Sequence, residues 1–301
     1  MSLISTDRIV KLFTEVSQEL RKIRYESQVE EFENAIKIVS EGDSWFHFPL
    51  MPIMTDVINN LIYFPADSPF AVYSVGNPGD DLVNYVKKVD GELTGNIIKA
   101  LNKENPQFLL ISGGGNDILR SDLGGMDNII EPVDTSQLDR PTEEYLNDHY
   151  TTVLLPILMN VYKDIFDFVN ANHPECHVLT HSYGYLQPRG GDYVQEPLEK
   201  IGFTTTNFGS SANKKLKMKQ VTKAVIDAFH DALFALTESY SNVHLVDCRG
   251  VLTSNDWFDE GHPSSQGCSK MSDKFSDKML EILGLDELPE LILKEEGDDG
   301  E

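Results

Sequence analysis

Five short apolar runs, each followed by turn residues and then by a longer segment, recur along this chain. They cover residues 36–39, 70–75, 107–112, 176–181 and 243–247. Runs of four to six apolar residues between turn signals are typical of strands buried on both faces. Strands that alternate with helices form a parallel sheet covered by helices on both faces. The sequence therefore predicts an α/β protein, with three α/β/α layers around a five-stranded parallel sheet.

Helical spacing of apolar residues fills most of the segments between these strands. We expect helices over residues 6–34, 55–62, 82–89, 95–102, 142–172 (bent at Pro156), 214–239 and a last segment ending near residue 283. Two stretches, 119–140 and 189–211, are instead rich in glycine and polar residues. We interpret them as insertions at the edge of the sheet, and their conformation does not follow from the pattern.

The 301-residue length allows one or two domains, and no linker divides the chain. We expect one domain over 35–285, preceded by a helical extension over 1–34. The extension carries an apolar stripe that suits packing on the domain, and a dimer contact is the alternative. Residues 286–301 end in an acidic run with few apolar side chains, so we expect a disordered tail.

The net charge of the chain disfavours some classes of binding partner. Lys and Arg number 25 and Asp and Glu number 49, so the formal net charge is 25 − 49 = −24. This charge disfavours nucleic acid and anionic membranes as partners. Cys176, Cys248 and Cys268 are too widely spaced for a disulfide framework or a zinc site, so we expect no metal. Neither a signal peptide nor a membrane-spanning run stands out, which favours a cytoplasmic location, with leaderless secretion as an alternative.

The triplet Gly42-Asp43-Ser44 directly follows the first predicted strand. A serine at this point lies at the carboxyl edge of the sheet, where open α/β sheets bind ligands. The triplet alone is most often only a turn. A serine hydroxyl is also a weak nucleophile until a base removes its proton. The assignment of chemistry to Ser44 therefore depends on what else reaches this edge.

Three other stretches supply what acyl transfer by a serine requires. They contain Gly79, Asn116 and the pair Asp259/His262. A histidine can act as the base, and a carboxylate three residues earlier can hold its other ring nitrogen. Backbone amides and an asparagine side chain can stabilise the oxyanion of the tetrahedral intermediate.

The four motifs GDSW, GNPGDD, GGGND and DEGHP, in this order, resemble those of the SGNH hydrolases, the GDSL esterases and lipases. The resemblance spans roughly residues 35–283 and implies a flavodoxin-like version of the three-layer fold. It implies that Ser44 is the nucleophile, His262 the base and Asp259 the residue that orients it. It also implies an oxyanion hole formed by the amides of Ser44 and Gly79 and the side chain of Asn116. No cofactor is implied.

The chain departs from the family pattern in two places. Trp45 stands where the family usually has leucine, and Ser74 stands near the place where the second motif commonly opens with asparagine. These departures leave the catalytic assignment unchanged but prevent an inference of substrate from family subgroups. Gly76 remains an alternative to Gly79 as the source of the oxyanion amide.

Several side chains near the motifs are candidates for the substrate pocket. We expect the pocket to include Trp45, His181, Tyr183 and Tyr185, with core packing as the alternative for Trp45. The other histidines lack a partner motif and are interpreted as structural. We expect Asp43 and Asp117, which flank the catalytic motifs, to accept hydrogen bonds from loop amides.

Together these features predict a serine esterase that cleaves small or carbohydrate-borne acyl esters through an acyl-enzyme. Lysophospholipid is a further substrate that the sequence leaves open. Transfer of the acyl group to a sugar or another alcohol is an alternative activity. A binding module on an inactive hydrolase scaffold is an alternative from a different class.

Overall fold

The computed structural model describes residues 6–48 and 55–294. Its main sheet contains five strands, all parallel, in the order β2-β1-β5-β6-β7. The strands are β1 (Ile36–Gly42), β2 (Phe70–Ser74), β5 (Phe108–Ser112), β6 (His177–His181) and β7 (Val243–Val246). The predicted five-stranded parallel sheet is confirmed.

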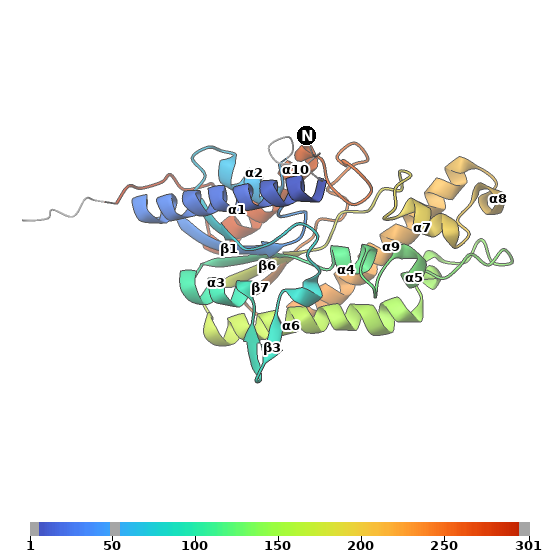
Figure 1. The fold of residues 1–301 in the computed structure, drawn as a ribbon, viewed down its shortest axis with the longest axis horizontal. Coiled ribbons are helices and arrows are strands. Elements are labelled where there is room, and N and C mark those ends of the chain that lie inside the picture. Colours follow the sequence, from blue (N-terminus) through green and yellow to red (C-terminus); the bar gives the residue numbers. More distant parts are fainter. Residues whose placement is uncertain (1–5, 49–54, 295–301) are drawn as a thin grey trace, which may run out of the picture.

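Helices cover both faces of the sheet (Figure 1). One face carries α1 (Thr6–Glu31), α2 (Val57–Tyr63) and α10 (Ser265–Leu283). The other carries α3 (Asn96–Glu104), α6 (Leu155–Asn172) and α9 (Ser211–Thr237). The three-layer α/β/α architecture is therefore confirmed. No helix in the described ranges has the length and apolar character needed to cross a bilayer.

The apolar strand residues form the core between these layers. Ile38, Val39 and the residues 108–111 of β5 are fully buried. Burial of one such side chain contributes up to about 1.5–3 kcal/mol relative to exposure. Because β1 lies between β2 and β5, its apolar residues are covered by strands on both edges and by helices on both faces. This interior strand carries the Gly-Asp-Ser turn.

The segment 82–89 is not the expected helix. A short 3-10 turn over Leu82–Asn84 leads into a hairpin of β3 (Lys87–Val89) and β4 (Glu92–Thr94). Asp90 and Gly91 connect the two strands, with φ angles of 52° and 86°. An Asp-Gly pair readily adopts these left-handed conformations in a two-residue hairpin turn. The turn signal therefore outweighs the helical spacing here.

The expected long helix over 142–172 is divided. A 3-10 turn at Thr142–Tyr145 is followed by a π-helical turn at Tyr150–Leu154, which runs into α6. Pro156 lies in the first turn of α6, where its missing N–H group costs nothing. The proline therefore marks a helix start rather than a bend.

The two insertions pack against each other beyond the carboxyl edge of the sheet (Figure 1). The first contains α5 (Met126–Ile129), and the second contains α7 (Gln195–Lys200) and α8 (Thr205–Phe208). The Val133 amide donates to the Ile201 carbonyl at 2.8 Å, which joins the two segments. They rest on the ends of α6 and α9 that extend past the strands, and so form a wall beside the sheet edge.

Helix α1 is fastened to the loops after β1 and β2 by buried polar contacts. Arg21 is 1% exposed and pairs with Asp56 at 2.5 Å. Its guanidinium also donates to the Phe46 carbonyl at 2.9 Å. One turn earlier in α1, the side-chain Nε2 of Gln18 donates to the Gly76 carbonyl at 2.9 Å. The N-terminal helix therefore contacts the loops that carry the first two motifs.

The chain after α10 returns to the end of α1. The Glu33 amide donates to the Ile292 carbonyl at 3.0 Å, and the Lys294 amide donates to the Glu31 carbonyl at 2.9 Å. Residues 286–294 are thus packed on the folded unit, which differs from the disorder expected for 286–301. The acidic residues 295–301, on which that expectation rested, lie outside the described residues.

Candidate active site

The turn after β1 places Ser44 at the carboxyl edge of the sheet. The Asp43 amide donates to the Ser112 carbonyl of β5 at 3.2 Å, and the Phe46 amide donates to the Asp43 carbonyl at 3.1 Å. The loop after β2 lies directly against this turn at Gly76. A Cβ atom there would lie 2.3 Å from the Gly42 carbonyl oxygen, so only glycine allows this close approach.

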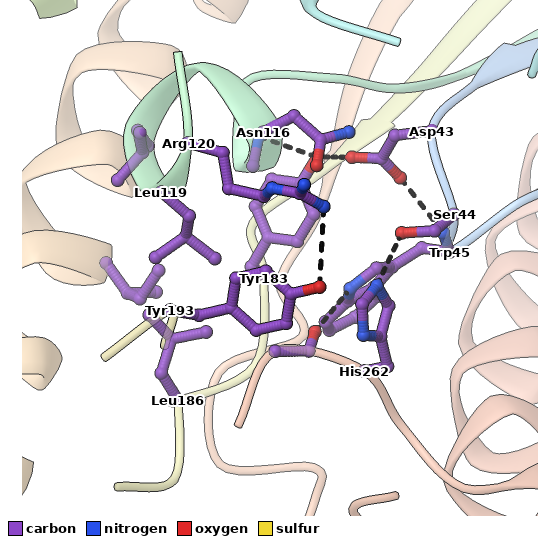
Figure 2. A pocket seen from close by; sticks show the side chains of 14 residues that line it. Asp43, Ser44, Trp45, Asn116, Leu119, Arg120, Tyr183, Leu186, Tyr193 and His262 are labelled. Carbon is purple, nitrogen blue, oxygen red and sulfur yellow. Dashed lines mark hydrogen bonds between the residues drawn. The ribbon is translucent and has the colours of Figure 1, made fainter. Parts of the chain in front are cut away.

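Ser44, His262 and Asp259 form a continuous chain of hydrogen bonds. His262 Nε2 lies 2.8 Å from Ser44 Oγ (Figure 2). His262 Nδ1 lies 2.7 Å from Asp259 Oδ2. Because a carboxylate only accepts, Nδ1 carries the proton and Nε2 is free to accept the serine proton. This is the arrangement that activates a serine hydroxyl.

The Asp259 carboxylate is held in its ionised form by its surroundings. Burial raises the pKa of this carboxyl, but its hydrogen bonds from His262 and from the Gly261 amide outweigh burial and leave the pKa below the ordinary value. The second oxygen, Oδ1, accepts from the amides of Gly261 at 2.8 Å and His262 at 2.7 Å. The same carboxylate therefore orients the imidazole and fixes the loop that carries it.

Glu260, between the two residues of the Asp/His pair, points the other way. It is 2% exposed. Its carboxylate accepts from the amides of Arg189 at 2.7 Å, Val194 at 2.9 Å and Gln195 at 3.1 Å. Glu260 thus ties the second insertion to the histidine loop. Sequence reasoning missed this residue, because its partners are backbone amides that leave no motif.

Asp43 couples the serine turn to the loop after β5. Tyr183 Oη donates to Asp43 Oδ2 at 2.6 Å and accepts from the Gly115 amide at 3.0 Å. Ser112 Oγ and the Trp45 amide donate to Asp43 Oδ1 at 2.9 and 3.0 Å. Asp43 accepts from a loop amide, as expected. The network holds the Ser44 turn and the Asn116 loop in a fixed position relative to each other.

Asn116 lies in the first turn of the short helix α4 (Gly115–Leu119) and contacts the loop after β2. Its Nδ2 donates to the Asp80 carbonyl at 3.1 Å, and the second N–H of the same amide remains available. The neighbouring Asp117 carboxylate accepts from the Leu82 amide at 2.7 Å, as expected. These contacts join the second and third motifs.

The residues assigned to the oxyanion hole differ in whether they line the cavity beside Ser44. Within the described ranges, the amides of Ser44 and Gly79 donate to no protein acceptor. Gly79 has a φ angle of 78°, with open space beside it. Ser44 and Asn116 line the cavity described next, whereas Gly79 is not among its lining residues in the described part of the chain.

A cavity of about 30 Å³ opens beside Ser44 and His262 (Figure 2). Its walls are mostly apolar, and besides Ser44, Asn116 and His262 they include Trp45, Ile118, Leu119, Arg120, Tyr183, Leu186, Tyr193 and Ile226. Trp45 and Tyr183, two of the residues expected in the pocket, thus line this cavity. Leu186 and Tyr193 come from the second insertion and its approach, and no sequence pattern identified them.

His181 and Tyr185 are placed elsewhere. His181 is 1% exposed and lies behind Trp45, with the two rings stacked at 5.5 Å between centroids. Burial lowers the pKa of His181 to about 4, so the ring is neutral. Tyr185 faces a separate groove and donates to Asp227 at 2.9 Å. Neither residue belongs to the cavity at Ser44.

Glu41, on β1, is a buried carboxyl group whose raised pKa makes the stability of the fold depend on pH. It is 4% exposed, and its surroundings raise its pKa from the ordinary 4.5 to about 8, through burial first and the nearby Asp80 second. Between these pH values the unfolded chain loses this proton and the folded protein keeps it. Stability therefore falls as pH rises from 4.5 to about 8. The Glu41→Gln variant should be about 4 kcal/mol more stable than wild type at pH 8 and equal to it near pH 4.

Urea unfolding of both proteins at the two pH values measures this difference. Glu92→Gln, on the exposed hairpin, removes the same charge and serves as the control, with no pH-dependent gain expected. A Glu41→Gln variant less stable than wild type at pH 8 would show that the carboxylate is ionised and stabilised in the fold.

Comparison with protein-family models gives no match, and comparison with curated proteins gives none either. Among solved structures, this chain is similar to the lipase Lip_vut3 from a goat rumen metagenome, with 12% identity, coverage of 80% of this chain and 96% of that chain, and a TM-score of 0.48. It is also similar to a carbohydrate esterase family 3 protein from Talaromyces cellulolyticus, with 13% identity, coverage of 83% and 98%, and a TM-score of 0.45.

A third similar structure is Est24, a carbohydrate acetylesterase from Sinorhizobium meliloti, with 12% identity, coverage of 82% and 99%, and a TM-score of 0.41. At these identities and TM-scores the similarities carry no argument about activity or substrate. The fold rests on the sheet order and layers of this chain, and the chemistry rests on its own side chains.

Proposed function

We propose that this protein is a serine esterase of the SGNH type that cleaves short-chain acyl esters. The observation that carries the proposal is the hydrogen-bonded series Asp259–His262–Ser44, with contacts of 2.7 and 2.8 Å. Serine, imidazole and carboxylate in this order form the arrangement used for acyl transfer on several unrelated folds. The fully connected set also weighs against an inactive scaffold.

The reaction follows from the positions of the protons. Ser44 Oγ attacks the ester carbonyl carbon while His262 Nε2 takes the hydroxyl proton, and Asp259 stabilises the imidazolium. His262 then returns the proton to the leaving alcohol, which gives an acyl-enzyme. Water, deprotonated by His262, attacks the acyl carbon, and Ser44 leaves with the proton. No cofactor takes part in these steps.

The oxyanion is expected to meet donors from three loops. We assign this role to the Ser44 amide and the second N–H of the Asn116 side chain, both on residues that line the cavity, and to the Gly79 amide of the loop after β2. Loss of one such donor typically costs about 3–4 kcal/mol of transition-state stabilisation. The buried links through Asp43 and Tyr183 hold the donors in place before the substrate arrives.

The size of the cavity supports a short acyl chain. A volume of about 30 Å³ holds on the order of two water molecules. An acetyl group fits this space, whereas a longer acyl chain must displace wall residues or extend out of the cavity into solvent. Since close-packed walls resist such movement, chain length should control the rate.

A series of p-nitrophenyl acetate, butyrate and octanoate tests this proposal. We expect kcat/KM to fall about tenfold or more from acetate to octanoate. Leu186→Ala, which removes a wall residue, should reduce this loss, while the exposed Leu216→Ala should leave it unchanged. Product analysis with an added alcohol separates hydrolysis from acyl transfer. Wild type that prefers the octanoate would contradict the short-chain assignment.

A further inference from the structure

Arg120 is the one cationic side chain, apart from the catalytic histidine, among the described residues that line the cavity. On the basis of the proposed esterase activity, we propose that Arg120 and Tyr193 form an anion-binding subsite for the leaving alcohol. The preferred substrates are then short-chain esters whose alcohol carries a carboxylate or phosphate group.

The position of Arg120 follows from α4. Its amide donates to the Asn116 carbonyl at 2.8 Å, so it lies one turn after the oxyanion donor and on the same face of the helix. Its side chain is exposed and extends into the space in front of Ser44 (Figure 2). An anion held there would lie beside the reacting ester.

Tyr193 connects Arg120 to the leaving-group side of the site. The guanidinium lies over the Tyr193 ring, 5.1 Å from its centroid, and its Nη1 is 3.4 Å from Tyr193 Oη. The Tyr193 ring in turn lies 5.9 Å from the His262 ring. His262 must protonate the departing alcohol, so that alcohol lies on the Tyr193 side. Stacking on an aromatic ring also fixes the plane of the guanidinium.

The charge of Arg120 is not matched by a carboxylate of the protein. In the described part of the chain, no carboxylate oxygen lies within 4.0 Å of its guanidinium. Arg21 and Arg249, by contrast, each pair with an aspartate. Asp81 is close enough for Arg120 to oppose the rise in its pKa, but it forms no ion pair. Arg24, Arg140 and Arg189 also lack a carboxylate partner in that part of the chain, so Arg120 is distinguished by its place in the wall of the cavity beside Ser44.

The chemistry of the group indicates the ligand. A guanidinium presents N–H donors in a planar fork that matches two oxygens of a carboxylate or phosphate. The surrounding walls are apolar, so the acyl group is held without charge while the alcohol is recognised by its anion. The acidic surface repels anions at long range, and discrimination therefore depends on this contact after the substrate has entered.

The test compares two acetate esters of nearly equal size, the anionic p-acetoxybenzoate and the neutral p-acetoxybenzamide. Arg120→Gln should lower kcat/KM for the anion about fivefold to tenfold, mainly through KM, and change it less than twofold for the amide. For each ester, kcat/KM of Arg120→Gln is divided by that of wild type, and this ratio does not depend on the different reactivity of the two leaving groups. Arg140→Gln is the control, since Arg140 also stacks on a tyrosine, 3.8 Å from the Tyr145 centroid, but does not line the cavity.

The identity of the anion follows from p-acetoxyphenyl phosphate. If Arg120→Gln lowers kcat/KM for this phosphate ester more than for p-acetoxybenzoate, the subsite is assigned to phosphate. If it lowers kcat/KM less, the subsite is assigned to carboxylate. An unchanged ratio of anionic to neutral ester in Arg120→Gln, with Ser44-dependent hydrolysis intact, overturns the subsite. So does a wild-type enzyme whose discrimination does not weaken as salt is raised.

Failure of the esterase proposal gives a different result, because neither ester would then be hydrolysed. Calorimetric binding of the two esters to Ser44→Ala and to Ser44→Ala/Arg120→Gln decides the subsite in that case. Tighter binding of the anion that is lost without Arg120 supports it, and equal binding by both proteins overturns it.

Discussion

Ser44→Ala is expected to lower kcat for p-nitrophenyl acetate by about ten-thousandfold or more. The reason is that alanine removes the only atom positioned to receive the acyl group at 2.8 Å from the base among the described residues. His262→Ala should cause a loss of similar size, because the serine then keeps its proton. Residual turnover would come from the oxyanion donors and from substrate binding alone.

The double variant Ser44→Ala/His262→Ala should be no slower than either single variant, since the two residues act as one unit. Ser239→Ala, at an exposed serine in the turn after α9, is the matched control and should retain wild-type kcat. Initial rates at saturating ester measure all four proteins. Losses in the single variants that multiply in the double variant would contradict a shared role.

Arg21→Met is expected to destabilise the folded protein by about 3–5 kcal/mol, because it leaves Asp56 buried without its partner. The melting temperature should fall by roughly 10 °C. The Phe46 carbonyl next to the serine turn also loses a donor, so activity should decline before global unfolding as the temperature rises. Circular dichroism and ester hydrolysis, followed over the same temperature range, measure both effects.

Two further variants separate the buried pair from the loss of an arginine as such. Arg24→Met, on the same helix and partly exposed, should cost less than about 1 kcal/mol. Arg21→Met/Asp56→Asn keeps the oxygen that accepts the Asn59 amide but removes the unpaired charge, and should recover a large part of the stability. Equal melting temperatures for Arg21→Met and Arg24→Met would show that the contacts of Arg21 on α1 do not stabilise the fold around the site.

The meeting of Ser44, Asp259 and His262 could be predicted because its signals are local and repeated. Each apolar run fixes a strand, and a polar residue just after a strand must lie at the carboxyl edge of the sheet. Ser44 and Asn116 follow neighbouring strands β1 and β5, so their meeting depends only on the sheet order. Asp259 and His262 are three residues apart in one loop, which brings the carboxylate to the ring.

The pocket could not be predicted in the same way. His181 ends a strand at the active edge, but the side chain at that position points into the layer behind Trp45. Strand register decides this, since neighbouring residues face opposite sides of the sheet. Tyr193 reaches the site through an insertion anchored by Glu260 to backbone amides, which no residue pattern encodes. The contact of Arg21 on α1 with the Phe46 carbonyl likewise joins two segments that are distant in the sequence, and no local pattern predicts it.

The most direct test of the catalytic assignment is covalent labelling with a fluorophosphonate ester, followed by mass spectrometry of the digested protein. The account predicts a single adduct per chain on the peptide that contains Ser44, and much slower labelling in His262→Ala. An adduct on another serine, or equal labelling rates with and without His262, would contradict it.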